Sequence, residues 1–191
     1  VNYLVPDRFK FGYGLTPEIV DGAVQFKPAV IVTVDNGIAS GEGVAHANTL
    51  GISVVVTDHH LPGREFPAAA ATVNPNQAGC EFPSKSLAGV VVAFYLLSVL
   101  RTELRSRDWF AHHPEINLAS FLDLVALGTV ADVVPMDQNN RRLVEEGIRR
   151  IRGGHCRPGL KAMLLAAGVN PQHLTTRDLA FSIAPRLNAA G

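Results

Sequence analysis

Two continuous runs of apolar, mostly β-branched residues constrain the fold of this chain more than any other feature. They are PAVIVTV at residues 28–34 and ISVVVT at residues 52–57. Neither run alternates with polar residues, so each is expected to form a strand buried on both faces of a parallel sheet. Between them, residues 40–51 offer a helix cap, a short helical stretch and a glycine stop. A strand, a helix and a strand in about 30 residues predict a parallel pair joined by a right-handed crossover.

The rest of the chain extends this pattern and then becomes helical. Residues 69–75 predict a third strand that ends at Pro75, and helical periodicity dominates from residue 86 onward. The predicted fold class is therefore α/β, with a parallel, Rossmann-like sheet flanked by helices and a mostly helical C-terminal half. We expect an α/β core over residues 1–135 and a helical extension of the same core over residues 136–191.

Composition narrows the class of protein further. With 47% hydrophobic and 18% charged residues, the chain is globular rather than disordered. No apolar run reaches the roughly 18 residues that a membrane span needs, so no membrane partner is expected. Two cysteines do not make a disulfide framework, and this favours the reducing cytoplasm.

The charge pattern leaves one question open. A net charge of zero gives no general reason to expect a nucleic-acid partner. Residues 141–161 nevertheless hold seven of the 17 lysines and arginines. These basic residues either contact phosphates or stabilise helix C-termini without any ligand, and the sequence does not choose between the two.

Polar side chains follow the two predicted strands at the point where each strand ends. Asp35 follows the first strand, and Asp58, His59 and His60 follow the second. In an open parallel sheet, ligands bind outside the carboxyl ends of the strands, and neighbouring strands lie about 5 Å apart. We therefore expect an aspartate from one segment to meet an aspartate and two histidines from the other.

Carboxylate together with imidazole is ligand chemistry for Mn²⁺, Zn²⁺, Fe²⁺ or Co²⁺. A further acid, Asp132, lies among apolar residues in LGTVADVVP and needs a partner. Plainer interpretations exist, because Asp35 begins a common Asp-Asn-Gly turn and Asp132 alone could cap a helix. The Asp-His-His run at a strand end has no such structural explanation, so a metal site is the stronger hypothesis.

Five motifs occur in a characteristic order along the whole chain. They are VTVDNG (32–37), VTDHHLPG (56–63), FPSKSLAGVVVAFYL (82–96), DLVALGTVADVVP (123–135) and APRLNAAG (184–191). Together they resemble the RecJ family, which comprises bacterial single-strand-specific DNA exonucleases of the DHH phosphoesterase superfamily. Residues 1–135 would then be the DHH phosphoesterase core.

The resemblance implies a role for each residue at the predicted strand ends. Asp35 would bridge two divalent ions, and His59 and Asp132 would be further metal ligands. Asp58 and His60 would be catalytic, with Asp58 orienting a histidine and His60 near the scissile phosphate. The implied metal is Mn²⁺, or Mg²⁺, with two ions in the complete enzyme.

The resemblance also implies the substrate and its contacts. Arg8, Arg186 and Asn188 would bind single-stranded DNA. The reaction would be 5′-to-3′ hydrolysis that releases nucleoside 5′-monophosphates in DNA repair and recombination. Single-strand-binding proteins or helicases are possible partners. Two alternatives stay open: a phosphoesterase for short oligonucleotides or cyclic dinucleotides, and a non-catalytic replication scaffold.

The chain departs from the family pattern at one point. The family has an Asp-x-Asp motif after its first strand, and no such pair occurs in the 191 residues. We therefore expect a fragment that lacks its first strand, this motif and the downstream domains. Such a fragment is expected to be inactive alone.

Overall fold

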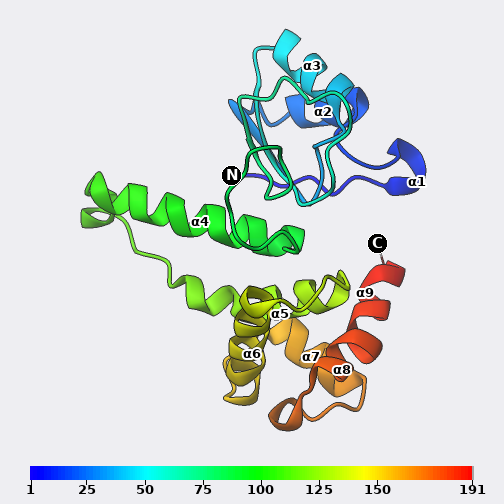
Figure 1. Ribbon diagram of the computed structural model, residues 1–191, viewed down its shortest axis with the longest axis vertical. Helices are drawn as coiled ribbons and strands as arrows, with labels where there is room; N and C mark the ends of the chain where they lie inside the picture. The colour runs from blue at the N-terminus through cyan, green and yellow to red at the C-terminus, as the bar shows by residue number, and fades with distance from the viewer. Residues whose placement is uncertain (191) are drawn as a thin grey trace. The chain divides into compact units, whose positions relative to one another are not determined.

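The computed structural model describes residues 1–190, which form two compact units, Val1–Lys85 and Ser86–Ala190 (Figure 1). The first unit contains α1 (Arg8–Phe11), α2 (Pro17–Val24), β1 (Val30–Val34), α3 (Gly41–Thr49), β2 (Ser53–Thr57) and β3 (Ala71–Val73). The second contains α4 (Gly89–Ser106), η1 (Trp109–Ala111), η2 (Leu118–Phe121), α5 (Leu122–Ala131), α6 (Gln138–Arg152), α7 (Pro158–Ala166), η3 (Pro171–His173), α8 (Thr176–Asp178), η4 (Leu179–Ile183) and α9 (Ala184–Ala190).

The first unit is built on a parallel sheet with the strand order β1-β2-β3. Val34 at the end of β1 pairs with Thr57 at the end of β2, and Thr57 pairs with Val73 of β3. The three strands therefore end at the same level. Helix α3 makes the crossover between β1 and β2, so the predicted strand-helix-strand unit and the α/β fold class are confirmed.

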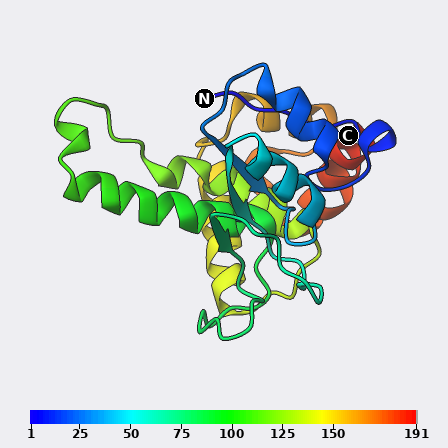
Figure 2. The same cartoon turned by 90° about the horizontal axis from the view of Figure 1, so that it is seen from above.

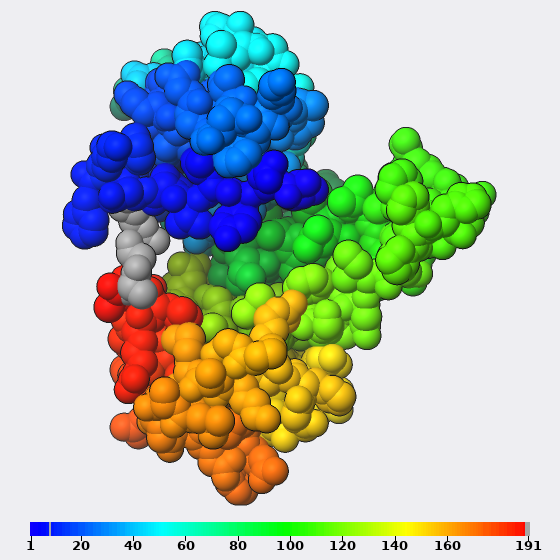
Figure 3. All heavy atoms as spheres, turned by 180° about the vertical axis from the view of Figure 1, so that it is seen from behind, coloured from blue at the N-terminus to red at the C-terminus, as the bar shows by residue number. Residues whose placement is uncertain are grey.

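Helices α2 and α3 pack side by side, as the blue and cyan spheres of Figure 3 show. Their apolar residues Val20 and Val44 are fully buried in one cluster with Val54 and Val56 of β2. This cluster is the hydrophobic core of the unit, and it fixes the strands whose ends carry the candidate site.

The expectation that the first strand is buried on both faces is wrong. Val30, Val32 and Val34 are 50%, 50% and 52% exposed. Successive residues of a strand point to opposite faces, and the core lies on the face that carries Ile31. In residues 1–190, the opposite face of β1 is partly open to solvent.

The second unit is helical. Helix α4 leads to η1, where the chain turns back towards α5, as both ribbon views show (Figures 1 and 2). Side chains from α5, α6, α7 and η4 form the core, which includes Ala126, Val144, Leu164 and Ile183. No helix within residues 1–190 has the length and apolar character needed to span a membrane.

The boundary expected from the sequence, between residues 135 and 136, falls inside the second unit. It lies between α5 and α6, and these two helices pack against each other. The division into residues 1–135 and 136–191 concerns the extent of the catalytic core, and it stays a prediction.

Close packing of α5 on α6 gives a testable expectation. A Cβ atom at Gly147 of α6 would lie 2.2 Å from the Leu122 carbonyl oxygen and 2.5 Å from the Ala126 Cβ. Gly147→Ala is therefore expected to lower the free energy of unfolding by about 2 kcal/mol, because the helices must move apart. Urea denaturation measures this change.

Gly159→Ala in α7 is the matched control. A Cβ atom there would meet no atom within 4 Å, so this substitution is expected to be neutral or slightly stabilising. Equal losses of stability for the two variants would contradict the close approach at Gly147.

Candidate metal centre

Asp35 occupies a tight turn directly after β1. Its amide donates to the Thr57 carbonyl oxygen at 3.0 Å, and its φ of +64° lies in the left-handed region, which aspartate tolerates. Gly37 follows with a φ of +111°, and a Cβ there would lie 2.6 Å from Thr33 Oγ1. The Asp-Asn-Gly sequence therefore suits the backbone of this turn, which places Asp35 beyond the end of the sheet.

Asp58 follows β2 and is almost completely buried, with 1% exposure. Its Oδ2 accepts a hydrogen bond from the Ile38 amide at 2.9 Å. Its Oδ1 lies 2.6 Å from His60 Nδ1 and also accepts from the amides of His59, at 2.8 Å, and His60, at 3.2 Å. One carboxylate therefore joins the loop after β1 to the loop after β2 and fixes the His60 ring.

These contacts change the acidity of Asp58. Burial raises the pKa of the Asp58 carboxyl group, but hydrogen bonds from the Ile38 amide, the His60 ring and the two histidine amides lower it more. The net result is a pKa below the usual value for aspartate. Asp58 is therefore ionised at neutral pH, as its contact with the His60 ring requires.

The lowered pKa predicts how stability depends on pH. The folded protein binds a proton at Asp58 less readily than the unfolded chain does, so this carboxylate stabilises the fold fully above the unfolded pKa of about 4. The stabilisation is lost as the pH falls towards the lower folded pKa. The difference in unfolding free energy between the wild type and Asp58→Asn is expected to shrink below about pH 5. A difference that stays constant down to about pH 2 would contradict this account.

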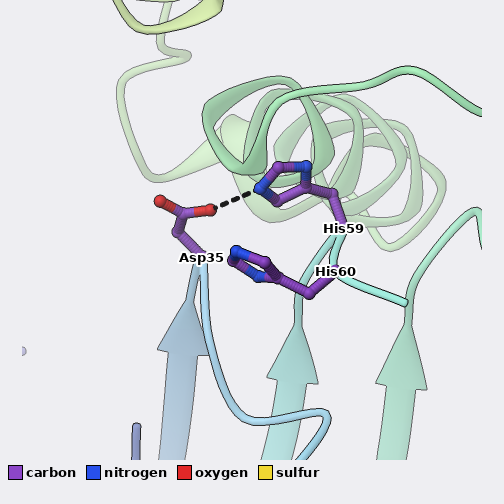
Figure 4. Close-up of side chains that lie close together, drawn as sticks. All are labelled: Asp35, His59 and His60. Carbon is purple, nitrogen blue, oxygen red and sulfur yellow. Dashed lines mark ion pairs between the residues drawn. The ribbon is translucent and has the colours of Figure 1, made fainter. Parts of the chain in front are cut away.

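Asp35, His59 and His60 meet at the carboxyl end of the sheet (Figure 4). Each can offer one ligand atom such that all three atoms lie within 4.8 Å of one another. His59 Nε2 lies 3.0 Å from Asp35 Oδ1, and the centroids of the two histidine rings are 4.4 Å apart. These three side chains therefore meet as the strand-end argument predicted, and the roles predicted for Asp35, Asp58, His59 and His60 stay predictions.

The geometry of this group fits a divalent ion. His59 Nε2 and Asp35 Oδ1, which a dashed line joins in Figure 4, come from two different loops and lie close enough to bind one ion. A carboxylate oxygen and an imidazole nitrogen that lie this close together are ligands that suit one divalent cation. Because Asp58 holds Nδ1 of His60, Nε2 is the atom of that ring left to face a ligand.

Sequence analysis missed three residues that support this site. Asn74 and Asn76 follow β3 and donate to the carbonyl oxygens of His60, at 2.9 Å, and His59, at 2.6 Å. The same strand-end argument could have found them, since β3 is a neighbour of β2. The Tyr13 hydroxyl donates to the Asp35 carbonyl oxygen at 2.6 Å, and no sequence pattern indicated this contact.

The other predicted site residues are not in this group. Asp132 is exposed at the C-terminal end of α5, in the second unit, and its role as a metal ligand stays a prediction. Arg186 and Asn188 are exposed on α9 of that unit. The side chain of Arg8 lies outside the described residues. Substrate binding by these three residues also stays a prediction.

Four of the seven basic residues between 141 and 161 make polar contacts within the second unit, and one of them is the bond from Arg141 to the Met136 carbonyl oxygen. Arg149 pairs with Glu146, and Arg157 pairs with the buried Asp123, both at 2.6 Å. Arg152 donates to the Leu174 carbonyl oxygen at 2.6 Å. These contacts favour a structural role over phosphate binding.

A parallel sheet with aspartate and histidine side chains at its carboxyl end makes this an α/β protein with a candidate metal centre. The family model described as "DHH family, N-terminal domain" matches residues 1–129, and the chain belongs to the DHH family.

Two related proteins match this chain over its whole length. It is 61% identical to the single-stranded-DNA-specific exonuclease RecJ of Salmonella typhimurium and 60% identical to that of Escherichia coli. In both cases the match covers 100% of this chain and 33% of the relative, so the chain spans about a third of their length.

Solved structures agree with the fold. A crystal structure of exonuclease RecJ bound to manganese matches with a TM-score of 0.80 and 34% identity, covering 98% of this chain and 44% of that one. A structure of RecJ from Thermus thermophilus in complex with Mn²⁺ matches with a TM-score of 0.73 and 34% identity. The match covers 91% of this chain and 24% of that one.

Proposed function

We propose that the full-length protein containing this chain is a metal-dependent exonuclease for single-stranded DNA. It works in the 5′-to-3′ direction, releases nucleoside 5′-monophosphates and serves DNA repair and recombination. The observation that carries the proposal is the group formed by Asp35, His59 and His60 at the carboxyl end of the sheet. The whole-chain likeness to RecJ exonucleases supports single-stranded DNA as substrate, and the direction follows from the family resemblance.

Asp35 and His59 hold a divalent ion, and Asp132 adds a further carboxylate ligand. Mn²⁺ suits a mixed carboxylate and imidazole site, with Mg²⁺ as the alternative, and two ions act in the complete enzyme. The similarity to a RecJ structure bound to manganese supports this choice. When bound, divalent ions lower the pKa of a water molecule and offset the charge of the phosphodiester.

The remaining residues orient the site and the DNA. Asp58 holds the His60 ring through Nδ1, so that the opposite side of the ring faces the scissile phosphate. Arg8, Arg186 and Asn188 contact the DNA strand, where the guanidinium groups bind phosphate oxygens. Asn74 and Asn76 keep the histidine backbone in place through their bonds to its carbonyl oxygens.

A DNA substrate also suggests where the protein acts and with what. We place it in the cytoplasm, where bacterial chromosomal DNA lies. Single-strand-binding proteins and helicases are the proposed partners, because they hold or produce the single strands that such an enzyme consumes.

Digestion of end-labelled oligonucleotides tests the proposed function. With Mn²⁺, the full-length protein is expected to release a 5′ label as a mononucleotide from the first time points, and a 3′ label only late. Chelation of the metal is expected to stop the reaction, and a blunt duplex is expected to resist it. Early release of the 3′ label would contradict the direction. Cleavage of dinucleotides but not of longer strands would favour a short-oligonucleotide phosphoesterase instead.

A further inference from the structure

The connector between α5 and α6, residues 132–137, adopts a strained conformation next to Asp132. Val133 has a φ of +57°, in the left-handed region where the Cβ of a β-branched residue crowds the backbone. Its side chain is 85% exposed, so no burial of apolar surface offsets the strain. A glycine would adopt this conformation without strain, yet valine occupies the position.

The first turn of α6 holds the far end of this connector. Asn140 donates through Nδ2 to the Pro135 carbonyl oxygen at 2.9 Å and to the Ser86 carbonyl oxygen at 2.7 Å. Arg141 Nε donates to the Met136 carbonyl oxygen at 2.7 Å. Two successive carbonyl groups of the connector are thus fixed by side chains of one helix turn.

The Asn140 side chain is itself in an unfavourable environment. The residue is 0% exposed, and its Oδ1 has no hydrogen-bond partner in the part of the chain that the structure describes. A buried amide oxygen without a donor destabilises a fold. The connector and the first turn of α6 therefore combine two unfavourable features, a left-handed valine and a buried amide oxygen, within one short stretch of chain.

Strain of this kind persists only where the surrounding structure enforces it, and it concentrates at functional sites. The group with metal-ligand chemistry at the start of this connector is the carboxylate of Asp132. We infer that Val133 and Asn140 are positioning residues for Asp132. Asn140 holds Pro135 and keeps Val133 in the left-handed turn, and this turn sets the direction of the neighbouring Asp132 carboxylate. The inference rests on the proposed function, in which Asp132 is a metal ligand.

The test makes two measurements on the full-length protein. Titration calorimetry gives the Mn²⁺ affinity, and thermal unfolding without metal gives the stability. Asn140→Ser, which frees Pro135, is expected to lower the affinity about 10-fold, as loss of residues that orient metal ligands commonly does. Val133→Gly removes the strain, so the double variant Asn140→Ser with Val133→Gly is expected to regain most of the affinity. A purely structural role for Asn140 would not produce this recovery.

Asn139→Ser is the matched control in the same helix turn. Asn139 accepts a hydrogen bond from the Tyr95 hydroxyl at 2.5 Å, so its loss is expected to lower the unfolding temperature and leave Mn²⁺ affinity unchanged. If Asn140→Ser fails to fold, Arg141→Met at the surface loosens the same connector, and a smaller fall in affinity is expected.

Two results would overturn the inference in distinguishable ways. If Asp132→Asn lowers Mn²⁺ affinity while neither Asn140→Ser nor Arg141→Met does, the positioning role is wrong and the ligand assignment stands. If Asp132→Asn leaves the affinity unchanged, the ligand assignment within the proposed function is wrong, and the positioning role is wrong with it.

Discussion

Asp35→Asn is expected to reduce the Mn²⁺-dependent nuclease rate of the full-length protein by about 1,000-fold or more. Asparagine has nearly the same shape and also tolerates the left-handed backbone at this position, so the turn after β1 is retained. The substitution removes the negative charge that lies 3.0 Å from His59 Nε2 and draws a cation to the site. Single-turnover digestion of labelled single-stranded DNA measures the rate, and calorimetric titration with Mn²⁺ measures the loss of affinity.

Asp21→Asn is the matched control for this experiment. Asp21 lies in α2 of the same unit and pairs with His46 at 2.7 Å, and neither residue belongs to the candidate metal group. Its substitution is expected to leave both the rate and the Mn²⁺ affinity unchanged. If Asp35→Asn retained wild-type cleavage, the assignment of Asp35 as a metal ligand would be wrong.

Asp58→Ala is expected to lower the free energy of unfolding by about 3–5 kcal/mol, because four hydrogen bonds to a buried carboxylate are lost and each contributes roughly 1 kcal/mol or more. The variant leaves the Ile38 amide, two histidine amides and His60 Nδ1 without their common acceptor. Chemical denaturation near neutral pH, where the wild-type carboxylate is ionised, measures the change.

Asp58→Asn gives a graded comparison for the same position. It keeps one acceptor oxygen and the volume of the side chain but removes the charge, so its loss of stability is expected to be smaller than that of Asp58→Ala. A loss below about 1 kcal/mol for Asp58→Ala, the range typical of exposed carboxylates, would show that the buried network contributes little.

The sequence alone predicted the parallel sheet and the meeting of Asp35 with His59 and His60. Both predictions rest on local rules: β-branched runs form strands, and parallel strands place the residues after them at one end of the sheet. The exposure of Val30, Val32 and Val34 could not be predicted in this way, because a strand run does not reveal which of its faces another element covers.

Within each unit, other contacts join segments that lie far apart in the chain. Tyr13 reaches the Asp35 carbonyl oxygen across 22 positions, and Asn140 reaches Ser86 across 54. The left-handed valine at position 133 is contrary to local preference, so its conformation could not be predicted from propensity. Such departures from local rules identify positions where tertiary structure decides the backbone.

The hydrogen bonds that Asp58 accepts from Ile38 on one side and from His59 and His60 on the other have a consequence for engineering this site. Residues 35–38 and 58–60 are linked by the Ile38–Asp58 hydrogen bond and the Asp35–His59 ion pair, so displacement of either stretch breaks these contacts. Loop exchange with a related protein should therefore transplant both stretches together, because a graft of one alone leaves Asp58 facing a mismatched partner.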